Sequence, residues 1–332
     1  MTIRIGISGW TYPPWRGVFY PEGLPQKDEM AYAANTFPTI EVNGTFYGLQ
    51  KPTSFRRWRD GTPPDFVFSI KGSRYITHIL RLRNARKALA NFLASGLLAL
   101  GPKLGPILWQ LPPSLRFDPD ALESFLAMLP GDFRSAAKLA ATHDRPIRGG
   151  AFLRVEENLP LRHALEIRHE SFRDDRFIAL LRRYGTAIVI ADTVEWPCLQ
   201  DITADFIYAR LHGSEELYAS GYSDEALDNW ARKFRAWSKG GEPRGAKRVS
   251  GKAPAKLLGR PRDVFIYFDN DIKVRAPFDA LGLASRLRVP AGQPPAEDWV
   301  REPARTRRTA GRKAPSRRNP WKSPEAAQSR NP

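Results

Sequence analysis

Short apolar runs recur along the chain, and several of them are almost continuously hydrophobic. Eight such runs, rich in Ile, Val, Leu, Phe and Tyr, occupy residues 3–9, 39–44, 66–72, 105–112, 163–169, 186–192, 206–213 and 264–271. A nearly continuous apolar run is typical of a strand that is covered on both faces, as in a parallel sheet. The pattern therefore predicts eight parallel strands.

Between these runs, apolar residues recur with the period of an α-helix. The clearest helical segments are residues 84–100, 118–130, 173–185, 223–238 and 276–288. Asn84, Asp118 and Ser223 are suitable N-cap residues for three of them. Gly185 suits the left-handed position that ends a helix. The connection at 193–205 is short, so we expect no helix there.

The alternation of strands with helices indicates the fold class. Such a pattern predicts an α/β protein with a parallel sheet. Eight units that end near residue 289 predict one closed (β/α)₈ barrel of the TIM type over residues 1–289. The alternative is an open doubly wound sheet, which is expected to carry a glycine-rich phosphate turn after the first strand. The sequence GISGWTYPPW at residues 6–15 is not such a turn.

The composition and the N-terminal sequence indicate the cellular compartment of the protein. The 332 residues are 42% hydrophobic and 11% aromatic, which is enough for a large core. The start, MTIRIGISGW, has no basic region followed by an apolar segment, so we expect no signal peptide. The longest apolar run, at residues 92–100, is about half a membrane span. The single Cys198 excludes an intramolecular disulfide. We therefore expect a cytoplasmic protein without a membrane segment.

The net charge of +17 is concentrated in two segments. Residues 290–332 hold ten Lys or Arg and four Asp or Glu, while residues 232–263 hold eleven and two. We expect residues 238–263 to be a flexible basic excursion before the last strand, and residues 290–332 to be a disordered basic tail. Both segments could bind nucleic acid weakly and without sequence specificity, and the simpler alternative is that they only solubilise the chain.

Polar side chains close nearly every predicted strand. In a TIM-type barrel the C-terminal strand ends meet on one face, where the chemistry occurs. Three pairs at i and i+2 lie on one side of their strands: Glu41 with Asn43, Glu166 with Arg168, and Arg210 with His212. The other polar or aromatic strand ends are Trp10, Lys71, Gln110, His169, Asp192, Asp269 and Asn270. An inward cluster of both charges either neutralises itself or binds a charged ligand.

Seven segments together carry a resemblance to a known family. In order they are GISGWTYPPWRGVFYPEGLP, EVNGTFYGLQKPTSFRRW, FVFSIKGSRYITH, LGPILWQLPPSLRFD, LEIRHESF, ADFIYARLHG and IYFDNDIKVRAPFDA. The chain resembles the YecE-like proteins, also called domain of unknown function 72, from about residue 3 to 282. The resemblance implies a TIM-type barrel but no activity, because the family has no settled one. Asp269 stands where the family usually has an amide, and Lys273-Val274-Arg275 replaces a smaller and less charged stretch.

One function that fits the strand ends is acid–base catalysis on a small anionic substrate, such as a phosphorylated sugar, a nucleotide or a carboxylate. The expected catalytic residues are Glu41, Glu166 and His212. The expected substrate-binding residues are Trp10, Tyr12, Asn43, Lys71, Arg74, His78, Gln110, Arg168, Asp192, Arg210 and Asp269. Lys71 is expected to contact the anion, and a Schiff base at this residue is the alternative.

Two further functions stay open. A metal-dependent isomerase or nuclease-like hydrolase would use Glu166, Asp192, His212 and Asp269 as ligands, because carboxylates and imidazole suit Mg, Mn or Zn. Nearby arginines would compete for these carboxylates and no HExxH motif occurs, so no cofactor is predicted and a divalent metal is the alternative. A nucleic-acid-associated protein would use the barrel as a platform for its basic segments. No phosphate-binding loop, GxSxG or GxGxxG motif occurs, which argues against the common ATPases, serine hydrolases and dinucleotide enzymes.

Overall fold

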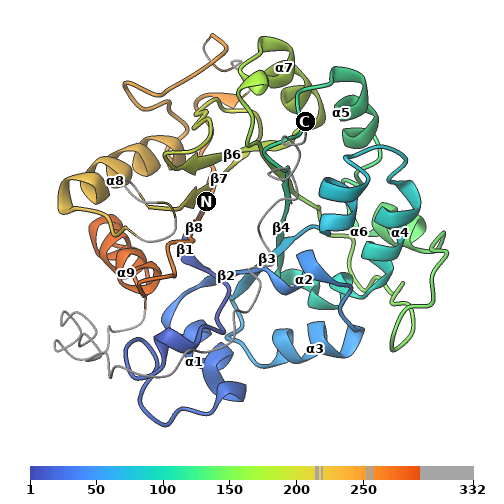
Figure 1. Cartoon of the computed structure of the whole chain (residues 1–332), viewed down its shortest axis with the longest axis horizontal. Coiled ribbons are helices and arrows are strands. Elements are labelled where there is room, and N and C mark those ends of the chain that lie inside the picture. The colour runs from blue at the N-terminus through green and yellow to red at the C-terminus, as the bar shows by residue number, and fades with distance from the viewer. Residues whose placement is uncertain (214–216, 218–219, 252, 254–256, 292–332) are drawn as a thin grey trace, which may run out of the picture. The chain divides into compact units, whose positions relative to one another are not determined.

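A closed barrel of eight parallel strands in sequence order forms the centre of the protein (Figure 1). The computed structural model describes residues 1–213, 217, 220–251, 253 and 257–291. The strands are β1 (Ile3–Ser8), β2 (Thr39–Val42), β3 (Val67–Lys71), β4 (Leu104–Gln110), β5 (His163–Glu166), β6 (Ala187–Asp192), β7 (Phe206–Leu211) and β8 (Asp263–Phe268). The predicted TIM-type barrel is confirmed.

Helices lie around the outside of this barrel (Figure 1). They are α1 (Glu29–Thr36), α2 (Gly44–Tyr47), α3 (Pro52–Asp60), α4 (Arg86–Ala94), α5 (Pro119–Leu126), α6 (Phe133–Ala140), α7 (Asp175–Tyr184), α8 (Asp224–Ser238) and α9 (Ala276–Leu287). Four of the predicted helical segments correspond to α5, α7, α8 and α9. The connection from β6 to β7 has no helix, as predicted.

Three of the predicted helix ends are confirmed by their geometry. The side chain of Asp118 accepts a hydrogen bond from the backbone N of Ala121 at 3.1 Å and begins α5. Ser223 caps α8 through the backbone N of Ala226 at 3.2 Å. Gly185 adopts a φ of 61° and ends α7. Short polar side chains and glycine therefore fix these ends locally.

The single helix predicted over residues 84–100 is wrong. Asn84 has a φ of 50° and is not the N-cap, and α4 ends at Ala94. Gly96, with a φ of 115°, then turns the chain into a 3-10 helix at Leu97–Lys103. A Cβ atom at Gly96 would lie 2.7 Å from Cα of Pro52, so glycine is needed both for the turn and for the close approach of α3.

The barrel interior changes character along its length. Aromatic and aliphatic side chains fill its middle and N-terminal part: Leu108, Ala164, Ala187, Val189, Phe206, Tyr208, Phe265 and Tyr267. These positions alternate with outward-facing residues, as the pleat of a strand requires. Two residues further along several of the strands, the inward positions are charged. The apolar layer therefore forms the floor of a polar layer at the C-terminal end.

The basic excursion makes contacts with the connection at 193–205. The carboxylate of Asp201 accepts hydrogen bonds from the backbone N of Val249 at 3.0 Å and of Ser250 at 3.1 Å. These contacts do not test the predicted flexibility of residues 238–263, which stays a prediction. The predicted tail at 290–332 lies, apart from its first two residues, outside the described part of the chain. Within that described part, no helix is both long enough and apolar enough to cross a membrane.

Candidate functional site

Arg210, near the end of β7, is the centre of a charged cluster at the C-terminal end of the barrel. Its buried guanidinium donates to both carboxylate oxygens of Glu41, with Nε 3.1 Å from Oε2 and Nη2 3.0 Å from Oε1. Nη1 lies 2.7 Å from Oε2 of Glu166, and Nη2 lies 2.7 Å from Oδ2 of Asp269. Nη2 is also 3.2 Å from Oγ of Ser8. One cation thus binds three carboxylates that come from three different strands or strand ends.

Neutral donors complete the environment of Glu41. The Ser8 hydroxyl donates to Oε1 at 2.5 Å, and the Tyr208 hydroxyl donates to Oε2 at 2.6 Å. Tyr208 also lies 2.7 Å from Oγ of Ser69 on β3. The amide of Asn43 donates to Oγ of Ser8 at 3.1 Å, and its Oδ1 atom has no hydrogen-bond partner among the described residues. Glu41 is therefore fully engaged, while Asn43 leaves an acceptor unused.

Glu166 is held in the same way at the end of β5. Its Oε1 atom accepts from Nε2 of Gln110 at 3.0 Å and from Nε of Arg168 at 2.8 Å. Burial opposes ionisation of this carboxyl, but Arg210 and Arg168 outweigh it and hold its pKa well below the usual range. Glu166 therefore stays ionised at neutral pH and is a weak base.

His212 and Asp269 form the third arm of the cluster. Nδ1 of His212 lies 3.1 Å from Oδ2 of Asp269, and Nε2 lies 3.5 Å from Nη1 of Arg210. Burial and the charge of Arg210 lower the pKa of His212. Burial alone would raise the pKa of Asp269, but Arg210 and His212 lower it. The arrangement fits a neutral imidazole that carries its proton on Nδ1.

Lys71 ends β3 beside this cluster and differs from its other members. Its side chain is 8% exposed, and Nζ lies 4.6 Å from the ring centroid of Phe46. Among the described residues, Nζ forms no hydrogen bond and no ion pair. Burial, followed by the charge of Arg210, lowers the pKa of the amine to about 8.

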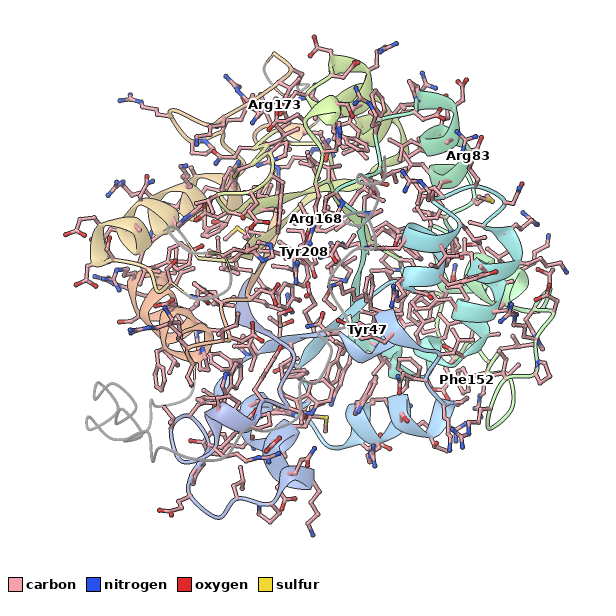
Figure 2. All side chains as sticks on the ribbon, viewed as in Figure 1. Tyr47, Arg83, Phe152, Arg168, Arg173 and Tyr208 are labelled. Atoms are coloured by element: carbon pink, nitrogen blue, oxygen red, sulfur yellow. The ribbon has the colours of Figure 1, made fainter. Side chains whose placement is uncertain are left out.

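Arg168 and His78 lie at the rim of the mouth. The Arg168 side chain is 13% exposed, and its guanidinium lies 4.0 Å from the ring centroid of Trp196. Figure 2 shows Arg168 and Tyr208 near the centre of the ring of strands, with Arg83 and Arg173 toward the outside. Burial, Arg168 and the exposed Arg74 lower the pKa of His78 to about 4, so this imidazole is neutral. The rim therefore carries a cation and an uncharged ring.

Tyr12 and Asp271 close the opposite side of the cluster. The Tyr12 hydroxyl donates to the backbone O of Ser8 at 2.5 Å. Burial and the neighbouring Asp269 raise the pKa of Asp271 to about 7. Asp271 is a site residue that the sequence reasoning missed, because it lies beyond the end of β8. The acidic run Asp269-Asn270-Asp271 was the available signal.

Two predicted residues lie away from the cluster. Asp192 ends β6 one position after the inward-facing Ala191, so its carboxylate accepts from Nε1 of Trp230 on α8 at 3.0 Å. The indole of Trp10 packs edge-to-face on Trp58 of α3, with ring centroids 5.7 Å apart. The prediction that Asp192 lies in the mouth was therefore wrong. Successive side chains of a strand point to opposite faces, and Asp192 occupies the outward one.

The four residues considered as metal ligands do not converge. Asp192 lies outside the barrel interior, and Glu166 and Asp269 are both bound by Arg210. In the described part of the chain, no group of three or more His, Cys, Asp and Glu side chains has the arrangement of a metal site. A cation so close to the carboxylates would repel a divalent metal. The donor set therefore does not fit the metal-dependent alternative.

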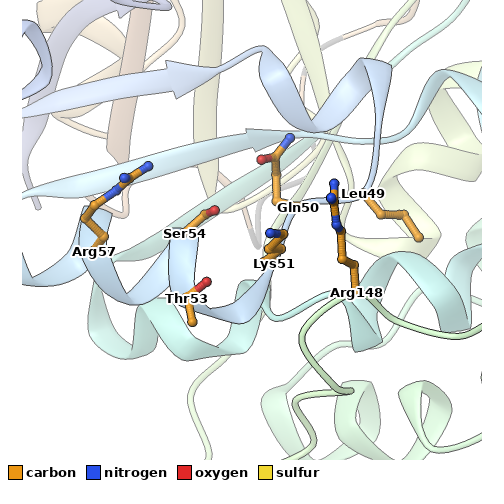
Figure 3. A pocket seen from close by; sticks show the side chains of 7 residues that line it. All are labelled: Leu49, Gln50, Lys51, Thr53, Ser54, Arg57 and Arg148. Carbon is orange, nitrogen blue, oxygen red and sulfur yellow. The ribbon is translucent and has the colours of Figure 1, made fainter. Parts of the chain in front are cut away.

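A separate cleft lies outside the barrel at the start of α3 (Figure 3). Its volume is about 620 Å³, and it is lined by Leu49, Gln50, Lys51, Thr53, Ser54, Arg57 and Arg148. None of the residues predicted from the strand ends lines it. Its Thr53, Arg57 and Arg148 side chains are exposed, so they are solvated without a ligand.

Comparison with known proteins identifies the family. Residues 4–304 match the family model described as "Protein of unknown function DUF72". The UPF0759 protein YecE of Escherichia coli strain K12 is 29% identical over 242 residues, which cover 71% of this chain and 82% of YecE.

Two solved structures of DUF72 family proteins have the same fold. One from Thermotoga maritima is 22% identical, with a TM-score of 0.64, and the match covers 87% of this chain and 100% of that one. One from Enterococcus faecalis is 15% identical, with a TM-score of 0.59, and the match covers 90% of this chain and 100% of that one. These matches confirm the resemblance found in the sequence motifs, and the chain belongs to the DUF72 family.

Proposed function

We propose that the protein is an enzyme that binds a small anionic substrate at the C-terminal mouth of the barrel and transfers a proton to or from that substrate. The observation that carries this proposal is the state of Lys71. It is a buried amine at the mouth, and it has no acceptor among the described residues. Its Nζ atom is not among the fully buried atoms that lack a hydrogen-bond partner, so a ligand in the mouth can reach it and supply the acceptor.

The charge distribution favours an anion as that ligand. Arg210 already binds the carboxylates of Glu41, Glu166 and Asp269. In the described part of the chain, none of these carboxylates accepts a hydrogen bond from Lys71. Arg168 adds a second cation at the partly exposed rim. A phosphate, carboxylate or similar group can accept from both cations.

We also assign different roles to the residues that the sequence predicted to be catalytic. Glu41, Glu166 and His212 hold Arg210 in place, and Arg210 is occupied by them, so these four residues support the site rather than meet the substrate. Proton transfer suits groups whose pKa lies near neutrality. Lys71, with a pKa of about 8, and Asp271, with a pKa of about 7, meet this condition.

A thermal-shift screen tests the proposal. Wild-type protein is screened against phosphorylated sugars, nucleotides and small carboxylates, alongside Arg168→Met and Arg173→Met. Arg173 is the matched control, because it lies on the exposed surface and pairs with Glu170. We expect at least one anion to raise the melting temperature of wild type and Arg173→Met, and to raise that of Arg168→Met much less. The proposal fails if no anion stabilises wild type, or if Arg168→Met responds as wild type does.

A further inference from the structure

Lys71 is held at a fixed position by its backbone. Thr45 donates a hydrogen bond from Oγ1 to the backbone O of Lys71 at 2.7 Å, and the next residue, Gly72, donates from its N to the backbone O of Leu108 at 2.7 Å. A Cβ atom at Gly72 would lie 2.3 Å from the Trp109 ring, so the chain is tightly packed directly after the lysine. The backbone of Lys71 is therefore fixed at the mouth, and burial restricts the side chain that it carries.

The surroundings of Lys71 favour the neutral amine more than those of Lys103 do. Lys103 is partly buried, but its Nζ donates to three oxygens: the backbone O of Arg59 at 2.6 Å, and the backbone O and Oγ1 of Thr62 at 2.7 and 3.1 Å. These acceptors stabilise an ammonium group. Lys71 has an aromatic ring in their place and Arg210 nearby, so its lone pair is available in a larger fraction of molecules at neutral pH.

From this geometry we propose that Lys71 is a nucleophile that forms an imine with the carbonyl carbon of a small anionic aldehyde or ketone bound at the mouth. The inference rests on the proposed function, because Arg168, a partly exposed cation at the rim that also pairs with Glu166, would contact the anionic group of the same molecule. A substrate of this class carries a carbonyl close to a carboxylate or a phosphate. Such a substrate would lie with its carbonyl carbon next to Nζ of Lys71 and its anionic group next to Arg168 at the rim.

The step balances without an oxidant or a reductant. The nitrogen lone pair of the neutral amine forms a bond to the carbonyl carbon, the C=O π pair moves to oxygen, and one proton passes from nitrogen to that oxygen to give the carbinolamine. The nitrogen lone pair then forms the C=N bond as the C–O bond breaks, and the leaving hydroxide combines with the second nitrogen proton to form water. The net change is amine plus carbonyl compound to imine plus one water.

Borohydride trapping tests the inference on the full chain. The protein is incubated separately with pyruvate, glyoxylate and dihydroxyacetone phosphate, reduced with sodium borohydride, and examined by intact mass and peptide mapping. Reduction converts the imine to a stable secondary amine at the same residue. We expect the Lys71 peptide to carry about tenfold or more label than any other lysine peptide with at least one probe, because its neutral fraction is higher.

Two variants serve as controls. Lys71→Arg keeps the cation but cannot form the imine, and it should lose the label. Lys87→Arg alters an exposed lysine that donates to the backbone O of Thr142, and it should keep the label. The inference is overturned if no probe labels Lys71, or if the label is spread evenly over the lysines. If anions still raise the melting temperature in that case, the proposed function stands and only the imine is lost. If no anion binds either, both fail.

Discussion

Arg210 and Glu41 face each other through two parallel hydrogen bonds in the barrel interior, and neither side chain is exposed to solvent. This bidentate geometry is the strongest form of an ion pair between these groups. The same guanidinium also binds Glu166 and Asp269, so three carboxylates share one positive charge. Arg168 and Lys71 are the other basic residues at this end of the barrel.

Removal of the central cation should destabilise the fold. Arg210→Met leaves three buried carboxylates without their main partner, and we expect a loss of about 3–5 kcal/mol in the free energy of unfolding. Arg183→Met is the control, because Arg183 pairs with Glu123 on the surface and its side chain is mostly exposed. It should change the stability little. Urea unfolding measures the free energy of unfolding of both variants, and equal values would contradict the role of Arg210.

The stability contributed by Glu166 should depend on pH in a defined direction. Its carboxyl has a lower pKa in the folded protein than in the unfolded chain, so its contribution is complete above the ordinary Glu pKa of ~4.3 and is lost as the pH falls further. Glu166→Gln should therefore be much less stable than wild type at pH 7, and the gap should narrow below pH ~4. Unfolding curves from pH 7 to acid check this. A gap that stays constant would show that the pKa of Glu166 is the same in the folded protein and in the unfolded chain, and Glu123→Gln on the surface is the control.

Gly6 of β1 should not tolerate a side chain. A Cβ atom there would lie 1.9 Å from the backbone O of Thr39 on β2, and neither strand can move without disturbing the barrel. We expect Gly6→Ala to cost about 3 kcal/mol. Gly131→Ala is the matched control, because no atom lies within 4 Å of a Cβ atom at that position. Urea midpoints for the two variants should differ clearly, and similar midpoints would mean that the strands can shift apart.

Any nucleic-acid binding should depend on the basic segments and not on the barrel mouth. A chain that lacks residues 290–332 loses ten basic residues, and its affinity for a fluorescent oligonucleotide should fall together with the steepness of its salt dependence. Lys71→Met should leave this binding unchanged. Fluorescence anisotropy at several salt concentrations measures both quantities. Affinity that survives the deletion would favour a nucleic-acid site on the barrel itself.

The barrel was predictable because its signals are local. Each apolar run identifies one strand, and residues such as Asp118 and Gly185 mark helix ends through contacts with near neighbours in sequence. The divided helix after Asn84 was not predictable, because Gly96 is required by its approach to Pro52 of another helix.

The candidate site was predictable in its location and less so in its roles. The i, i+2 spacing placed Glu166 with Arg168 and Arg210 with His212 on the inward side. It could not show that Arg210 is occupied, because its partner Glu41 lies 169 residues away in the chain. The error at Asp192 has a similar origin: only the register of β6 with β7 decides which face of the strand it occupies.

The Arg210 cluster joins the two halves of the chain. Arg210 and Glu166 come from the C-terminal four strands, while Ser8 and Glu41 come from the N-terminal four. A protein cut between β4 and β5 would leave Glu41 in one fragment and its cation in the other, so the N-terminal half alone would bury a carboxylate without the guanidinium that binds it. This barrel therefore cannot be treated as two self-sufficient half-barrels, and its fragments should become stably folded only when they are combined.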